Sequence, residues 1–107
     1  MKIIRNNIIP FPGFKAINLF GLLLIKKDTL LRSTDLTHEA IHTAQMREML
    51  YIPFYTWYFV EWLVKLMIYK NPKEAYWNIS FEREAYTYER SYLYLSLRKH
   101  YSWWKFL

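Results

Sequence analysis

Hydrophobic residues occur in short runs near the start of the chain. Residues 2–9 form an Ile-rich run, and residues 15–26 form a second run that contains Gly21. Short apolar runs bounded by turn-forming or charged residues are typical of strands. The pattern therefore predicts a strand in 2–9, at the edge of a sheet, and either one buried strand or two strands broken near Gly21 in 15–26.

From residue 33 onward the apolar positions recur at helical spacing. Ser33, Thr34 and Asp35 are candidate N-caps, and no Gly or Pro interrupts residues 36–50. The next helix is expected over 51–70, beginning near Pro53. A short helical turn follows at 72–77, and then a long last helix, capped by Ser80, that runs from Phe81 to about Lys99.

The stretch 51–70 is almost entirely apolar or aromatic, and it is nearly long enough to cross a bilayer. Glu61 and Lys65 lie one turn apart near its middle, and each charge costs roughly 2.5–3.5 kcal/mol to insert at the bilayer centre. We therefore favour a core helix that packs on the helix 36–50, with lipid contact along one face as the alternative.

Together these elements predict an α+β fold that is mostly helical. Short N-terminal strands or a hairpin would pack against about three helices in a single domain over residues 1–107. Apolar residues make up 53% of the chain and aromatic residues 21%, which excludes a disordered chain. Cysteine is absent, so any zinc site must use imidazole and carboxylate ligands.

The net charge is +6, and the basic residues are scattered singly or in pairs. No basic run or nucleic-acid module is present, so we expect no specific nucleic-acid partner. The interleaved basic and aromatic residues suit peripheral contact with an anionic membrane, and an exposed aromatic helix could pair with itself in a homodimer. Arg5, Pro10 and Pro12 interrupt the first apolar runs, so we expect no signal peptide and a cytoplasmic location, with association at a membrane as the alternative.

The strongest chemical signal is the pattern H-E-x-x-H at residues 38–42. On a helix, His38 and His42 share one face and can bind one metal ion, while the adjacent Glu39 can take a proton from water. A catalytic zinc site needs a third protein ligand. Glu82 and Glu84 are the candidates, and because they lie on different sides of a helix, at most one of them faces the metal.

The segments H-E-A-I-H at 38–42 and E-R-E-A at 82–85 resemble the gluzincin-type zinc metallopeptidases. Thr43 and Gln45 extend the first motif to a form that is similar to short, uncharacterised bacterial proteins. The resemblance implies a minimal zincin-like core, a Zn²⁺ ion held by His38, His42 and Glu82, and a peptide or protein substrate.

The chain departs from the gluzincin pattern at one position. Tyr86 stands where the family has an acidic residue that orients a histidine ligand, and its hydroxyl could substitute for that acid or stabilise an oxyanion. Glu84 remains an alternative ligand or a residue that supports one. The favoured function is a zinc-dependent metallohydrolase, specifically a peptidase. The alternatives are a non-catalytic metal-binding module and a peripheral membrane or interaction protein in which the two histidines are incidental.

Overall fold

Three strands form one mixed sheet in the computed structural model, which describes residues 2–6, 16–27 and 30–107. The strands are β1 (Lys2–Asn6), β2 (Ala16–Leu19) and β3 (Leu22–Lys26), in the order β1-β3-β2. Strand β3 pairs with β1 in parallel and with β2 in antiparallel orientation. The expectation of an edge strand near the N-terminus is confirmed over 2–6, while residues 7–9 and 15 lie outside the described residues.

The second apolar run is broken into two strands at Gly21, as one of the two alternatives predicted. Phe20 and Gly21 form the two-residue turn, with φ of 53° and 88°. Positive φ at both central residues is the type I′ geometry that matches the twist of a hairpin. The Tyr55 hydroxyl ties this turn to the helices, because it accepts from Phe20 N (2.9 Å) and donates to Asn18 O (3.0 Å).

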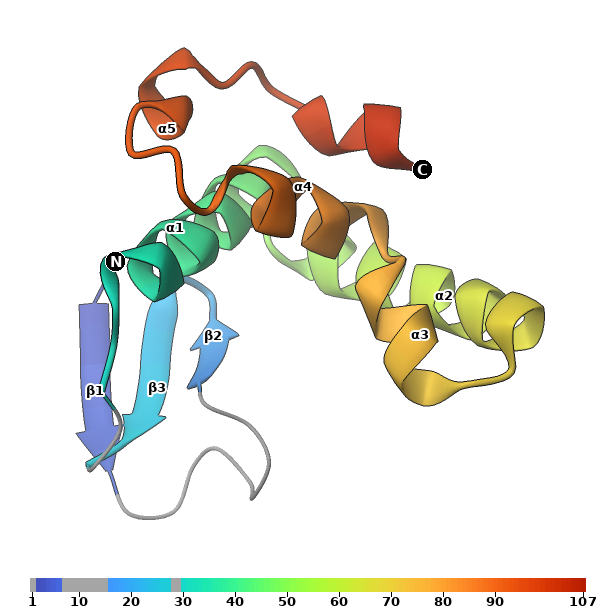
Figure 1. Ribbon diagram of the computed structural model, residues 1–107, viewed down its shortest axis with the longest axis horizontal. Helices are drawn as coiled ribbons and strands as arrows, with labels where there is room; N and C mark the ends of the chain where they lie inside the picture. The colour runs from blue at the N-terminus through green and yellow to red at the C-terminus, as the bar shows by residue number, and fades with distance from the viewer. Residues whose placement is uncertain (1, 7–15, 28–29) are drawn as a thin grey trace.

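Helix α1 (Ser33–Glu48) contains the H-E-x-x-H motif and lies between the sheet and the helices α4 and α5 (Figure 1). The earliest predicted cap was Ser33, but Ser33 is already the first residue of the helix. The N-cap is Arg32, whose backbone N–H donates to the Asp35 carboxylate at 2.9 Å. After Leu50 and Tyr51, both with positive φ, the chain reverses into α2 (Ile52–Tyr69).

The two charged residues in the middle of α2 face the protein interior. Glu61 accepts hydrogen bonds from the backbone N–H (2.5 Å) and hydroxyl (2.6 Å) of Ser80, at the start of helix α4, where the helix dipole favours a carboxylate. Lys65 Nζ lies 4.0 Å from the same carboxylate. In the described part of the chain, no helix combines the length and the apolar character needed to cross a membrane.

The predicted long last helix is wrong. The short helix α3 (Pro72–Trp77) occurs as expected, but α4 (Ser80–Tyr88) is capped by Ile79 and ends eleven residues before Lys99. A turn leads to a one-turn helix, α5 (Tyr94–Leu97). This break brings Tyr94 and Arg98 back onto Glu84, and these buried polar contacts override the local helical pattern.

The core forms where α1, α2 and α4 meet the C-terminal 3₁₀ helix η1 (Ser102–Phe106). Its buried side chains are Met46, Phe54, Ile79, Phe81 and Trp103. Phe81 is fully buried, so the core fixes the first turn of α4 and thereby the side chain that follows, Glu82. The fold is thus α+β and mostly helical, as predicted, with α1 and α4 as the helices that position the candidate site.

Candidate metal centre

Three side chains singled out from the sequence meet at one point between α1 and α4. Glu82 Oε1 lies 3.2 Å from His38 Nε2 and 3.0 Å from His42 Nε2, and the two Nε2 atoms are 3.1 Å apart. All three residues are buried. The spacing of one helical turn aligns the imidazoles, and the burial of Phe81 places the carboxylate opposite them.

The hydrogen bonds of Gln45 determine which nitrogen of His42 carries the proton. The Gln45 amide N–H groups donate to Phe81 O (3.0 Å) and Glu84 Oε1 (2.9 Å), so the amide oxygen faces His42. That oxygen lies 2.8 Å from His42 Nδ1 and can only accept. Nδ1 therefore donates, and the Nε2 lone pair of the neutral ring points at the shared centre.

A carboxylate fixes the other histidine in the same way. His38 Nδ1 lies 3.1 Å from Glu89 Oε1, so it donates and leaves its Nε2 lone pair directed at the centre. Glu89 thus supplies the acidic partner whose place in the sequence pattern is taken by Tyr86. The Tyr86 ring packs instead against His38, with ring centroids 4.4 Å apart, and its hydroxyl pairs with Tyr76 at 2.8 Å.

Three acceptor atoms that face one another favour a positive charge between them. Burial alone lowers the pKa of His42, but attraction to Glu82 outweighs it and raises the pKa to about 9. Burial alone raises the pKa of Glu82, yet the nearby His42 and His38 lower it overall. A proton or a metal cation at this point would satisfy all three groups.

The spacing of the three atoms fits a tetrahedral zinc site. With zinc–nitrogen and zinc–oxygen bonds near 2.0–2.1 Å, two ligand atoms of a tetrahedron lie about 3.3 Å apart. The three distances of 3.0–3.2 Å are within a few tenths of an ångström of that value. Two imidazoles and one carboxylate also form a donor set that catalytic zinc sites use.

Tyr58 on α2 holds the second oxygen of the Glu82 carboxylate. Its hydroxyl donates to Glu82 Oε2 at 2.6 Å, which leaves Oε1 for the imidazole pair. Burial and the neighbouring carboxylate raise the pKa of Tyr58, so the hydroxyl keeps its proton. Neither the sequence pattern nor the resemblance points to Tyr58, because ten tyrosines in one chain dilute any single choice.

Glu39 also lies close to the imidazole pair, near enough for the three residues to hold a metal ion. One side-chain atom each of His38, Glu39 and His42 fall within 4.8 Å of one another, and burial raises the pKa of the Glu39 carboxyl group. The side chain of Asn18, on β2, hydrogen-bonds the Glu39 carboxylate and donates to the Glu39 carbonyl at 3.0 Å. Glu82 makes the closer contacts with both imidazoles. Glu82 is therefore suited to bind the metal ion, and Glu39 is suited to accept a proton.

Glu84 points to the opposite side of α4 and does not reach the imidazole pair. It accepts from Gln45, from the Tyr94 hydroxyl (2.6 Å) and from Arg98 Nε (2.6 Å). Arg98 also pairs with Glu48 at 2.6 Å, and the charged atoms of this network are almost fully buried. Glu84 therefore supports His42 through Gln45, and sequence reasoning did not identify Gln45, Glu89 or Arg98 in these roles.

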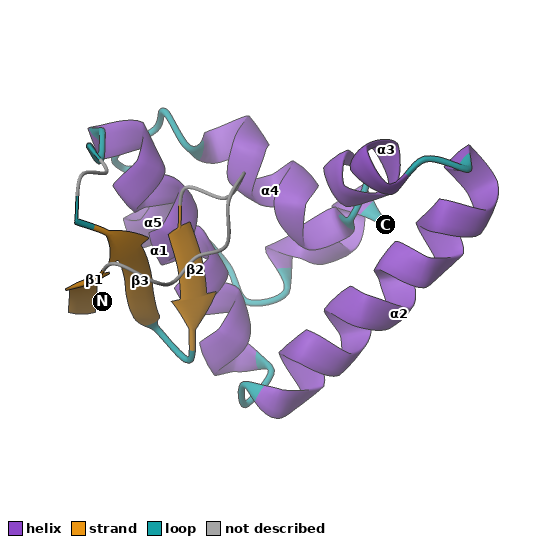
Figure 2. Ribbon diagram, turned by 90° about the horizontal axis from the view of Figure 1, so that it is seen from below, coloured by secondary structure: helices purple, strands orange, loops and turns teal. Residues whose placement is uncertain are grey.

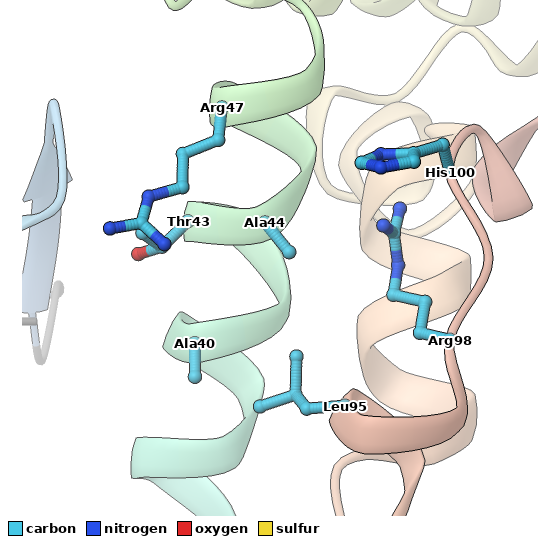
Figure 3. Close-up of a pocket in the computed structure, with 7 residues that line it drawn as sticks. All are labelled: Ala40, Thr43, Ala44, Arg47, Leu95, Arg98 and His100. Atoms are coloured by element: carbon cyan, nitrogen blue, oxygen red, sulfur yellow. The ribbon is translucent and has the colours of Figure 1, made fainter.

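A cavity of about 980 Å³ opens onto the centre. Its wall includes residues of β2 and a group of tyrosines: Tyr55, Tyr58, Tyr76 and Tyr86. A smaller cavity of about 430 Å³ lies on the far side of α1, between Ala40, Ala44 and Arg47 and the segment from Leu95 to His100 (Figure 3). The side chains of His38, Glu39 and Glu82 line only the larger cavity.

No known protein family, curated protein or solved structure matches this chain. The resemblance to gluzincins therefore depends on the motif residues at 38–42 and 82–85 alone.

Proposed function

We propose that this chain is a zinc-dependent metallohydrolase, and specifically a peptidase, in which His38, His42 and Glu82 hold the metal. The observation that carries the proposal is the convergence of three acceptor atoms at 3.0–3.2 Å beside a carboxylate at the wall of an open cavity. Both Nδ1 atoms are committed to acceptors, an arrangement that orients histidine ligands toward a metal ion.

The residues around the metal divide the chemistry between them. Zinc in this position would polarise a substrate carbonyl and lower the pKa of a water molecule toward 7. Glu39 then accepts a proton from the attacking water on its carboxylate and returns it to the leaving amine. A carboxyl group whose pKa is raised by burial is suited to both halves of this transfer.

Tyrosine hydroxyls at the cavity wall are suited to stabilise negative charge on the substrate. Burial raises the pKa of Tyr76 and of Tyr86, so both remain protonated and can donate. Their hydroxyls bond each other at 2.8 Å, and one of them can turn to an oxyanion while the other supports it.

Strand β2 supports a peptide as the substrate. Its residues Ala16, Ile17 and Asn18 line the cavity, and in the described part of the sheet β2 pairs with β3 alone. A peptide in extended conformation could lie along this wall of the cavity, beside the Asn18 carbonyl that accepts from the Tyr55 hydroxyl. In this position a peptide bond would lie alongside Glu39. The backbone carbonyl of Glu39 accepts a hydrogen bond from the side chain of Asn18 on β2.

The test combines zinc content with hydrolysis of a fluorogenic peptide library. We expect the protein to bind one zinc ion and cleave part of the library, His42→Ala to lose both properties, and Glu39→Gln to keep zinc and lose cleavage. Circular dichroism establishes that each variant is folded. Equal cleavage by Glu39→Gln, or zinc-loaded protein that cleaves no peptide, would overturn the assignment as a peptidase.

A further inference from the structure

The outward face of α2 is a continuous apolar surface. Its exposed side chains recur at helical spacing and are large; they include Ile52, Phe59, Val60, Leu63, Met67 and Ile68. No charged side chain is among the exposed residues of α2, because Glu61 is buried and Lys65 is half-buried. Figure 2 presents α2 along an outer edge of the described part of the chain, with no other element beyond it.

This surface is too extensive to be incidental. From Ile52 to Ile68 it spans roughly 24 Å at 1.5 Å per residue. Met67 is 72% exposed and Phe59 is 58% exposed, whereas the inward residue Phe54 is 2% exposed. Contiguous apolar areas of this kind mark a surface that a partner or a membrane covers.

The charge around α2 indicates an anionic occupant. The carboxylates of Glu48, Glu61, Glu82 and Glu84 are directed inward, with side-chain exposures of 1%, 7%, 6% and 0%. By contrast, Lys70, which caps the C-terminus of α2, and Lys73, in the first turn of α3, are exposed. Four carboxylates are thus buried while Glu74, beside Lys73, is exposed, and the chain as a whole carries a net charge of +6.

Two tryptophans flank the apolar face. Trp57 and Trp104 are 36% and 59% exposed, and their rings lie 6.0 Å apart. Lys105, next to Trp104, is also exposed, and its Nζ donates to the Tyr88 hydroxyl at 3.1 Å. Indole rings beside lysines favour the headgroup region of a bilayer, where an apolar face and a polar rim are both satisfied.

We propose that the outer face of α2 docks on the surface of an anionic lipid bilayer. Leu63, Met67 and their neighbours would enter the boundary between headgroups and acyl chains, and Lys70 and Lys73 would contact lipid phosphates. A second copy of the chain would offer the same uncharged face and the same net charge of +6. Anionic lipid supplies the missing charge.

Docking in this orientation also places the cavity beside the membrane. Phe59 belongs to the outer face of α2 and also lines the larger cavity. This consequence rests on the proposed function: the substrates would be peptide segments that lie at the membrane surface. The docking itself does not depend on hydrolysis and is measured separately.

Flotation with vesicles tests the docking. Vesicles of phosphatidylcholine are compared with vesicles that also contain phosphatidylserine, for wild type, Met67→Glu and the control Leu97→Glu. Leu97 is 76% exposed on α5, so the control introduces the same charge at an equally open apolar position. We expect wild type and Leu97→Glu to float with the anionic vesicles, and Met67→Glu to bind at least about tenfold more weakly.

Three results would overturn the proposal. Wild type could stay unbound to anionic vesicles at low salt, or Met67→Glu could float as well as wild type. Light scattering after gel filtration could instead reveal a dimer that Met67→Glu dissociates, in which case a second copy covers the face. Lysine variants add a charge test: Lys70→Gln with Lys73→Gln should weaken binding more than Lys99→Gln, since Lys99 is exposed on a different segment.

Discussion

The side-chain oxygen of Gln45 lies 2.8 Å from Nδ1 of His42. This contact links the candidate metal centre to a buried ion-pair network on the other side of α4, because the Gln45 amide nitrogen donates to Glu84 and Glu84 accepts from Arg98. The C-terminal segment therefore helps to decide which tautomer His42 adopts. A partner of this kind orients a ligand without touching the metal.

Replacing Gln45 with Met should weaken zinc binding while the helix stays intact. The substitution removes the acceptor for His42 Nδ1, so the ring is free to choose the other tautomer. Loss of such a partner typically lowers metal affinity about 10–100-fold. Competition with a chelating dye measures the affinity. Arg47→Met, an exposed site on the same helix, is the control and should leave it unchanged.

Glu89→Leu should weaken zinc binding through His38. Without the carboxylate, His38 Nδ1 loses the acceptor at 3.1 Å and its ring orientation is less fixed. We expect a fall in affinity of about tenfold or more in the same dye assay. The exposed Glu74 gives the matched control, Glu74→Leu. Equal zinc affinities for the two variants would show that Glu89 does not orient His38 for zinc binding.

Tyr58→Phe isolates a single hydroxyl group. The ring stays stacked on Phe81, whereas the donation to Glu82 Oε2 at 2.6 Å is lost. A carboxylate without this partner can rotate, so we expect zinc affinity to fall by about tenfold with little change in thermal stability. Tyr92→Phe, at an 85% exposed position, should match wild type in both measurements.

Arg98→Met should lower the free energy of unfolding and not only the affinity for zinc. It would leave the carboxylates of Glu48 and Glu84 buried without their shared partner. Breaking a buried ion pair in this way costs about 3–5 kcal/mol, a large share of the total stability of a small domain. Urea denaturation measures the loss. Arg90→Met, on the surface, should change the free energy of unfolding by no more than about 0.5 kcal/mol.

Local patterns were enough to predict much of the fold. Helix α1 was predicted from the helical spacing of apolar residues between Leu36 and Met49 and from the absence of Pro and Gly there. Gly21 predicted the position of the hairpin turn. These features depend on residues within a few positions of one another. The last helix was mispredicted because its break depends on a distant partner: Arg98 returns to Glu48, fifty residues earlier.

Part of the candidate site could likewise be predicted from local sequence, and part depends on distant contacts. The arrangement of His38, Glu39 and His42 follows from one helix, so the motif predicts it directly. The choice of Glu82 over Glu84 needed the resemblance, since only the packing of α4 decides which carboxylate faces α1. Glu89 carried a weak signal in advance, as it lies one turn beyond Tyr86 on the same helix face. Gln45 belongs to the extended motif, but its contact with His42 and the role of Tyr58 become evident only once the three helices are assembled.

The most direct test of the central claim is an anomalous difference map at the zinc absorption edge, from crystals grown with zinc. The account predicts one strong peak about 2.0–2.2 Å from Nε2 of His38, Nε2 of His42 and Oε1 of Glu82. A peak that instead lies at Glu84 or His100, or a map without a peak between the two imidazoles despite excess zinc, would contradict it.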